Sequence, residues 1–161
     1  MEHLLQYLWM HRIFPLQILQ TTDGTPLEII DSGLHNTDAG PDFFNAKIKI
    51  GQTLWVGNVE VHSVSSDWYR HGHDKDRSYD SIILHVIGQA DCEILRPHGQ
   101  SIPQFILDYS PSVKQHYSQL CQKTEYPRCH EILPTLSSFR IHSWLEALQI
   151  ERLELKTEQI K

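Results

Sequence analysis

The stretch from Leu54 to His62 constrains the fold more than any other part of the chain. Alternate residues fall on two sides, with Trp55, Gly57, Val59 and Val61 on one and Leu54, Val56, Asn58, Glu60 and His62 on the other. Side chains alternate across a β-strand, so this pattern predicts a strand on which Glu60 and His62 point the same way. A strand that is apolar on one side and begins apolar on the other is expected at the centre of a sheet, covered on both faces. The two polar side chains therefore fall in a sheltered place, where a buried charge needs a partner.

A second carboxylate, Asp42, begins the preceding strand, which we expect to run to Ile50. Asp42 follows a Gly-Pro turn, and Gly51-Gln52 then turns this strand back as a hairpin into the next one. Asp42, Glu60 and His62 are thereby expected at one edge of the sheet. Carboxylate oxygens suit Mg²⁺ or Mn²⁺, which makes Asp42 and Glu60 the predicted metal ligands. Taken singly, Asp42 is equally compatible with a turn-closing residue and His62 with a structural histidine.

Residues 62–74 carry further polar candidates. Ser65-Ser66 precedes either a helix that starts near Asp67 or a loop, since Gly72 weakens the helix by about 1 kcal/mol relative to alanine. On a helix, Asp67, His71 and Asp74 would share one face. His71 and His73 are two residues apart and would not share a helix face, so the usual two-histidine helical zinc site is not predicted. His71, His73 and Asp74 remain secondary site candidates, with Asn45 and Asn58 as expected supports.

The remaining pattern predicts an α/β or α+β fold with a mixed central sheet flanked by helices. We expect helices at 2–13, 111–121 and from residue 138 onward, and strands at 27–30, 82–87, 92–95 and 102–107, with a hairpin tip at residues 97–100. His85 lies inside the apolar strand 82–87, as a satisfied core histidine or as a residue that orients Glu60. A sheet-containing core is expected over residues 1–110 and a helical extension over 111–161. The chain ends inside a helical pattern without a cap, so we expect this extension to be truncated.

Composition limits the class of protein. The 161 residues carry a net charge of −6 and three cysteines. No apolar run is long enough for a membrane span, and no signal peptide is evident, so a cytoplasmic protein without membrane partners is expected. The acidic balance argues against a broad nucleic-acid surface. It is compatible with an acidic site that reaches DNA through metal ions.

Two short motifs carry a resemblance to known nucleases. Pro41-Asp42, followed by Glu60-Val61-His62, resembles the PD-(D/E)xK nuclease signature with His62 at the lysine position. The expected order of a helix, a strand, the Pro-Asp strand, the Glu-x-His strand, a helix and another strand is similar to that superfamily. The resemblance implies a restriction-endonuclease-like core, nucleic acid as partner and metal-dependent phosphodiester hydrolysis. Asp42 and Glu60 would bind the metal, and His71 or His73 would contact phosphate or water. Because histidine titrates near neutrality and lysine does not, His62 could act on the water as a general base, be a metal ligand, or do neither.

A second resemblance covers nearly the whole chain. The runs that carry it are Asn36-Thr37-Asp38-Ala39-Gly40-Pro41-Asp42-Phe43, Gly57 to His62, Ser65-Ser66-Asp67-Trp68, His71-Gly72-His73, Tyr79-Asp80 and Ile83-Leu84-His85-Val86. They resemble DUF2851, a bacterial family common in Bacteroidetes whose function is unknown. Members usually continue beyond this length, which agrees with the expected truncation.

Two other readings remain open from the sequence. In the first, the protein is a non-enzymatic interaction or structural protein with a degenerate site. Its C-terminal helix would bind a partner, a second copy or the rest of a longer chain. In the second, the histidines bind a small anionic ligand. Two carboxylates close enough to bind one metal ion at a position open to substrate would favour the metal-dependent enzyme over these two readings.

Overall fold

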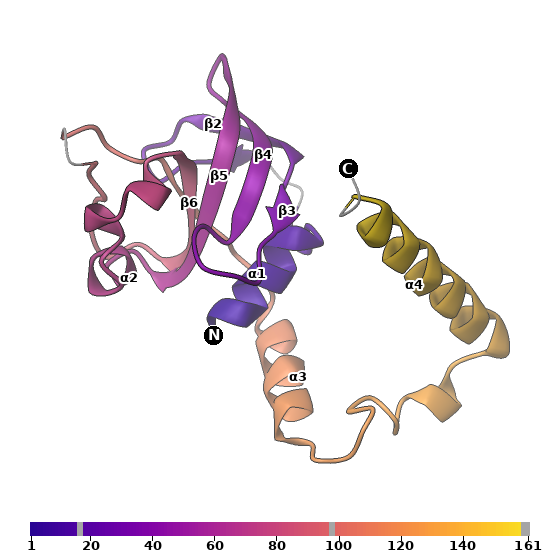
Figure 1. Ribbon diagram of the computed structural model, residues 1–161. Coiled ribbons are helices and arrows are strands. Elements are labelled where there is room, and N and C mark those ends of the chain that lie inside the picture. Colours follow the sequence, from indigo (N-terminus) through magenta and orange to yellow (C-terminus); the bar gives the residue numbers. More distant parts are fainter. Residues whose placement is uncertain (16–17, 97–98, 159–161) are drawn as a thin grey trace. The chain divides into compact units, whose positions relative to one another are not determined.

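The computed structural model describes residues 1–15, 18–96 and 99–158. The chain divides into two compact units, Met1–Lys114 and Gln115–Lys161 (Figure 1). The first unit carries the sheet and every predicted site residue.

Among the described residues, seven strands form one mixed sheet, which confirms the predicted α/β class. The strands are β1 (Leu19–Gln20), β2 (Pro26–Asp31), β3 (Leu34–His35), β4 (Phe43–Ile50), β5 (Thr53–Val64), β6 (Ile82–Gln89) and β7 (Gln104–Ile106). Their order is β1-β2-β4-β5-β6-β7, with β3 paired to β4. The pairs up to β4–β5 are antiparallel, whereas β5–β6 and β6–β7 are parallel.

The parallel connection from β5 to β6 is the segment that carries most of the predicted histidines. It contains α2 (Asp67–Arg70) and two short 3₁₀ turns, η1 (His73–Lys75) and η2 (Arg77–Tyr79). Parallel neighbours need such a crossover because the chain must return to the same end of the sheet. The residues of this crossover thus lie beside the end of β5 (Figure 1).

The sheet curls until its two edges nearly meet. The backbone N–H of Thr22, just after β1, donates to the carbonyl oxygen of Gln104 in β7 at 2.8 Å. This bond links β1 and β7, the strands at the two edges of the sheet, at one point. The sheet therefore has a nearly closed, barrel-like form.

Helix α1 (Glu2–Met10) packs on β5 through one apolar stripe. The stripe consists of Leu4, Leu5, Leu8 and Trp9, all buried. Their spacing places them on one helix face, as the sequence pattern predicts. The indole N–H of Trp9 donates to the carbonyl oxygen of Ser32 at 3.0 Å, which ties the helix to the β2–β3 connection.

Strand β5 is central, between β4 and β6, as predicted. Val59 and Val61 are fully buried on one side, and Glu60 and His62 are 5% and 1% exposed on the other. Both faces are therefore covered at the C-terminal half of the strand. The N-terminal half, Leu54–Val56, is exposed.

Two local predictions differ from the structure. The predicted helix after Asp67 ends at Arg70, because Gly72 adopts a left-handed backbone (φ +77°) and starts a new turn. Asp67, His71 and Asp74 therefore do not share a helix face. The segment 102–107 contributes only β7, which runs parallel to β6. Leu95 and Ser101 form an isolated antiparallel bridge, and residues 97–98 of the predicted hairpin tip lie outside the described residues.

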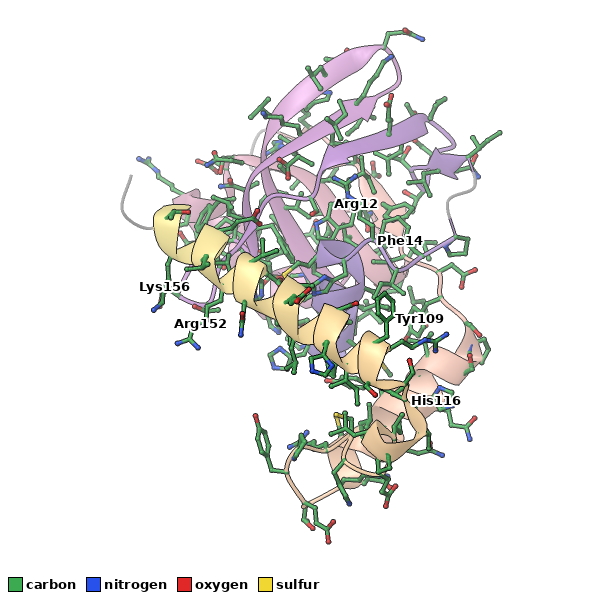
Figure 2. The ribbon with its side chains drawn as sticks, turned by 90° about the vertical axis from the view of Figure 1, so that its right-hand side faces the viewer. Arg12, Phe14, Tyr109, His116, Arg152 and Lys156 are labelled. Atoms are coloured by element: carbon green, nitrogen blue, oxygen red, sulfur yellow. The ribbon has the colours of Figure 1, made fainter. Side chains whose placement is uncertain are left out.

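The second unit consists of helices and connecting turns. Helix α3 (Pro111–Gln122) leads into it, and η3 (Leu133–Thr135) and α4 (Ser138–Glu158) follow, so both predicted helices are confirmed. Several large apolar side chains of α4 are exposed, among them Phe139 at 80% and Leu153 at 64%. Figure 2 shows Arg152 and Lys156 one turn apart on the same side of α4. No helix in the described part of the chain combines the length and apolar content needed to cross a membrane.

Candidate metal centre

A β-bulge in β4 sets the geometry around Asp42. Asn45 has a positive φ of 57° inside the strand. Its backbone N–H donates to the side-chain oxygen of Asn58 at 3.2 Å, and the amide of Asn58 donates to the Ser81 hydroxyl at 2.8 Å. Asparagine tolerates the left-handed region better than most residues. Asn45 and Asn58, predicted as supports, thus contact the bulge and not the carboxylates themselves.

The bulge decides which residue faces Glu60. Ala46 pairs with Gly57, and an unbroken register from there would place Asp42 opposite Val61. The register shifts by one residue between Phe43 and Ala46, so the continued pairing places Asp42 opposite Glu60. Bulges commonly re-aim side chains in this way.

The two carboxylates are held by each other's strands. The Asp42 N–H donates to Glu60 Oε2 at 3.1 Å, and the Val61 N–H donates to Asp42 Oδ2 at 3.0 Å. The Gln6 amide of α1 donates to the other Asp42 oxygen at 2.9 Å. Burial raises the pKa of Glu60 to about 7, helped by the nearby Asp42 charge, and burial also raises the pKa of Asp42. Each Asp42 oxygen thus accepts one hydrogen bond, and the backbone of Asp42 holds Glu60 in place.

Three histidines converge beside Glu60. One nitrogen from each of His62, His71 and His73 lies within 4.8 Å of one from each of the others. His62 is buried on β5, His71 follows α2 and is exposed, and His73 opens η1. The left-handed Gly72 reverses the chain between the last two, so residues that cannot share a helix face still point to one place.

The distance between two of these nitrogens is close to the distance between two ligands of one cation. His62 Nε2 lies 3.1 Å from His71 Nδ1, and ligands about 2.0–2.1 Å from a tetrahedral Zn²⁺ are about 3.3–3.4 Å apart. Glu60 Oε1 lies beside the histidines, 3.6 Å from His62 Nε2 and 3.2 Å from His73 Nε2. The cluster thus has the size to hold a single cation.

His62 is in a state suited to binding a cation. Burial, with a smaller contribution from neighbouring imidazoles, lowers the pKa of His62 to about 2, so the ring is neutral near pH 7. His73 Nε2 is buried, and Glu60 Oε1 lies 3.2 Å from it. The His73 ring stacks on Tyr79, with centroids 3.8 Å apart, and meets Trp68 edge-on at 5.4 Å. The two aromatic rings thus hold this imidazole beside Glu60 and the other histidines.

Asp74 lies apart from this cluster. It is half-buried in η1, and its Oδ1 has no hydrogen-bond partner among the described residues. Reasoning from the sequence missed Gln6 and Tyr79 as site residues. Tyr79 lies in one of the runs that carry the family resemblance, whereas no local signal marks Gln6, because its role depends on how α1 docks.

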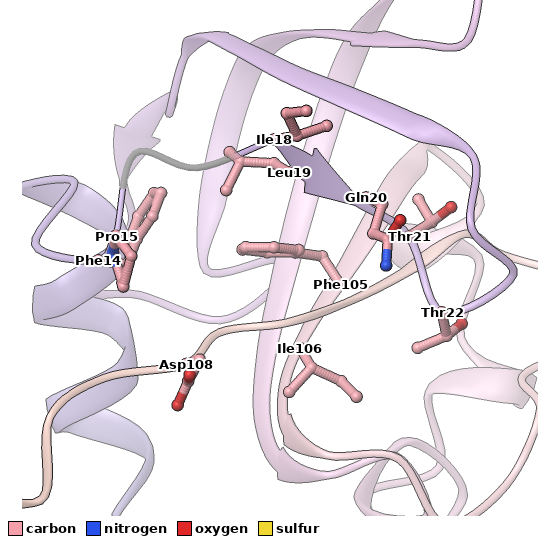
Figure 3. A pocket seen from close by; sticks show the side chains of 10 residues that line it. All are labelled: Phe14, Pro15, Ile18, Leu19, Gln20, Thr21, Thr22, Phe105, Ile106 and Asp108. Atoms are coloured by element: carbon pink, nitrogen blue, oxygen red, sulfur yellow. The ribbon is translucent and has the colours of Figure 1, made fainter.

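Two cavities in the described residues lie away from the histidines. One, of about 460 Å³, lies where β1 and β7 approach each other and is lined by residues that include Phe14, Ile18 and Phe105 (Figure 3). The other, of about 410 Å³, lies near Asp91–Glu93. Neither is lined by Glu60 or by the three histidines, so the metal centre is argued from its ligand atoms and not from a cavity.

Comparison with known proteins gives a single match. The model of the protein family described as "Protein of unknown function (DUF2851)" matches residues 2–161, and the chain belongs to this family. No curated protein and no solved structure matches the chain. The resemblance to PD-(D/E)xK nucleases gains no support from these comparisons and remains a prediction.

Proposed function

We propose that the first unit is a metal-dependent hydrolase domain with a single divalent cation held by His62, His71 and His73. The observation that carries this proposal is the convergence of three imidazoles beside the buried carboxylate of Glu60. Nitrogen ligands favour Zn²⁺ and neighbouring transition metals over Mg²⁺. The proposal therefore moves the metal from Asp42 and Glu60, the ligands expected from the sequence, to the histidines.

Glu60 is the proposed general base. A bound divalent cation would polarise a water molecule and stabilise negative charge on a reacting oxygen. Glu60 Oε1 lies next to two of the three histidines, within hydrogen-bond reach of a water bound at this place. Its other oxygen accepts from the Asp42 N–H, which fixes the orientation of the carboxylate. Asp42 in turn is held by Gln6 and Val61.

We further propose phosphodiesters as the substrate class. The support is the succession of α1, β2, β4, β5, α2 and β6, which follows the order that the nuclease resemblance implies once the two-residue strands β1 and β3 are left aside. Asp42 stands at the start of the Pro-Asp strand and Glu60 on the next one. His62 takes the lysine position, where we propose a metal ligand in place of a residue that acts on water.

Calorimetry with Zn²⁺ tests the metal site. We expect one Zn²⁺ per chain in the parent, strongly weakened binding in His71→Ala and His73→Ala, and unchanged binding in His11→Ala, which removes an exposed histidine outside the cluster. Circular dichroism checks that each variant is folded. Binding of Mn²⁺ that depends on Asp42 but not on His71 or His73 would overturn the histidine site in favour of the carboxylate site.

Hydrolysis assays test the chemistry separately. With Zn²⁺ or Mn²⁺ present, we expect the parent to cleave bis(p-nitrophenyl) phosphate or a DNA oligonucleotide, and Glu60→Gln to lose this activity while it still binds the cation. Glu60→Gln keeps the shape of the side chain and removes its basic oxygen.

A structural metal site in an interaction protein is the second candidate. The exposed apolar side chains of α4 favour it, because such side chains usually mark a surface that is covered in the functional state. In this case Zn²⁺ would raise the stability of the first unit, and no phosphodiester would be cleaved.

A further inference from the structure

His85 is the buried residue next to the metal centre that the proposed chemistry does not yet use. It lies in the middle of β6, where it pairs in register with Glu60 on β5, and its side chain is fully buried. Its Nε2 is 2.8 Å from Nδ1 of His62. Strands β5 and β6 are neighbours in the sheet, so this contact is built into the core (Figure 1).

The contact determines which nitrogen of His62 is free. A neutral imidazole carries one N–H and one lone pair. The Nε2 atom of His62 faces His71 and Glu60, so it must carry the lone pair in order to bind a cation there. The proton of His62 then lies on Nδ1, and the hydrogen-bond partner of this atom among the described residues is His85 Nε2.

We propose that His85 is a positioning residue whose Nε2 accepts a hydrogen bond from the Nδ1–H of His62 and so presents His62 Nε2 to the cation. This inference rests on the proposed metal site. Metal-binding histidines generally donate their second ring N–H to a fixed acceptor, which sets the tautomer and the ring orientation. If His85 donated instead, the contact would leave the proton of His62 on Nε2, where it would block the cation.

The surroundings of His85 suit it to this role. Its backbone N–H donates to the carbonyl oxygen of Pro103 at 2.9 Å, and its strand lies between β5 and β7, so the ring has a rigid base. Its Nδ1 is buried without a hydrogen-bond partner among the described residues. In the proposed arrangement the neutral ring of His85 accepts at Nε2 and carries its own proton on Nδ1.

Two substitutions separate this role from simple packing. His85→Gln keeps an oxygen near the place of Nε2 and can accept the proton, whereas His85→Leu fills the space without an acceptor. We expect His85→Leu to lose about 10–100-fold in Co²⁺ affinity and to change the visible absorption spectrum of bound Co²⁺. We expect His85→Gln to stay within about threefold of the parent and to keep its spectrum, in line with rescue by an acceptor. Equal affinities for His85→Leu and the parent, or equal losses in both variants, would overturn the proposal.

Nitrogen-15 spectra of the Zn²⁺-loaded parent give a test that requires no variant to fold. We expect the ring of His62 to be protonated at Nδ1 and bound through Nε2. A ring of His62 that is bound to Zn²⁺ but unprotonated at Nδ1, or that is bound through Nδ1, would refute the role of His85. Failure of the parent to bind Zn²⁺ or Co²⁺ at all would refute the metal site itself, so the two outcomes are distinguishable.

Discussion

The buried His85 makes a quantitative prediction about acid stability. Burial, with a smaller effect of His73, lowers the pKa of His85 from 6.5 to about 3 in the folded protein. Between these two values the unfolded chain binds a proton at His85 that the folded chain excludes. The proton that only the unfolded chain binds favours unfolding, so the free energy of unfolding decreases progressively as the pH falls from 6.5 towards 3.

The size of this decrease in the free energy of unfolding follows from the pKa of His85 in the unfolded chain, 6.5. Each pH unit below 6.5 costs about 1.4 kcal/mol, so at pH 5.0 the loss is about 2 kcal/mol relative to pH 7.5. This figure is the same for any folded-state pKa below about 4, because His85 is then neutral in the folded protein at pH 5.0. Glu60 acts in the opposite direction, since its raised pKa favours the folded state as the pH falls from 7 to 4.5.

A comparison of variants isolates the contribution of His85. We expect the free energy of unfolding to fall between pH 7.5 and pH 5.0 by about 2 kcal/mol less in His85→Gln than in the parent, because Glu60 and His62 are common to both. Urea unfolding with a chelator present measures this difference. A Trp144→Phe background leaves tryptophans only in the first unit, so that fluorescence reports on that unit.

The control is His11→Gln, which makes the same substitution at an exposed histidine outside the cluster. If His85→Gln loses the same free energy as the parent, to within about 0.5 kcal/mol, then burial does not keep His85 neutral and the reasoning is wrong.

Three further predictions use the same unfolding assay. In Gly57→Ala the new Cβ would lie 2.8 Å from the Ser81 carbonyl oxygen and closer still to the Ile83 side chain. We therefore expect the free energy of unfolding to fall by about 1–3 kcal/mol. Unchanged stability would mean that β6 can move away from β5. Leu84→Ala removes a fully buried side chain from β6 and should cost about 2–5 kcal/mol, whereas a cost below about 1 kcal/mol would contradict its place in the core. Phe139→Ser changes an exposed side chain of α4 and should alter the stability of the second unit, followed by circular dichroism, by less than about 0.5 kcal/mol, and a larger effect would contradict its exposure.

The sequence by itself determined the class of fold and the neighbourhood of the carboxylates. Alternation along β5 places Glu60 and His62 on one face, and the apolar residues of β6, which surround His85, require cover on both faces, since a strand has a period of two residues. These are local properties, so residues 54–62 and 82–87 predict them without knowledge of the rest of the chain. The helical stripe of α1 and the starts of α3 and α4 were predictable for the same reason.

Only the tertiary structure decided how the polar residues meet. The bulge at Asn45 shifts the register by one residue and thereby places Asp42 opposite Glu60, and no pattern in β4 reveals that shift. The left-handed Gly72 brings His71 and His73 to His62, although their spacing argues against a helical metal site. The physical reason is that periodicity reports which face of an element a side chain takes. The register between strands and the path of a short crossover depend on contacts between residues far apart in the chain.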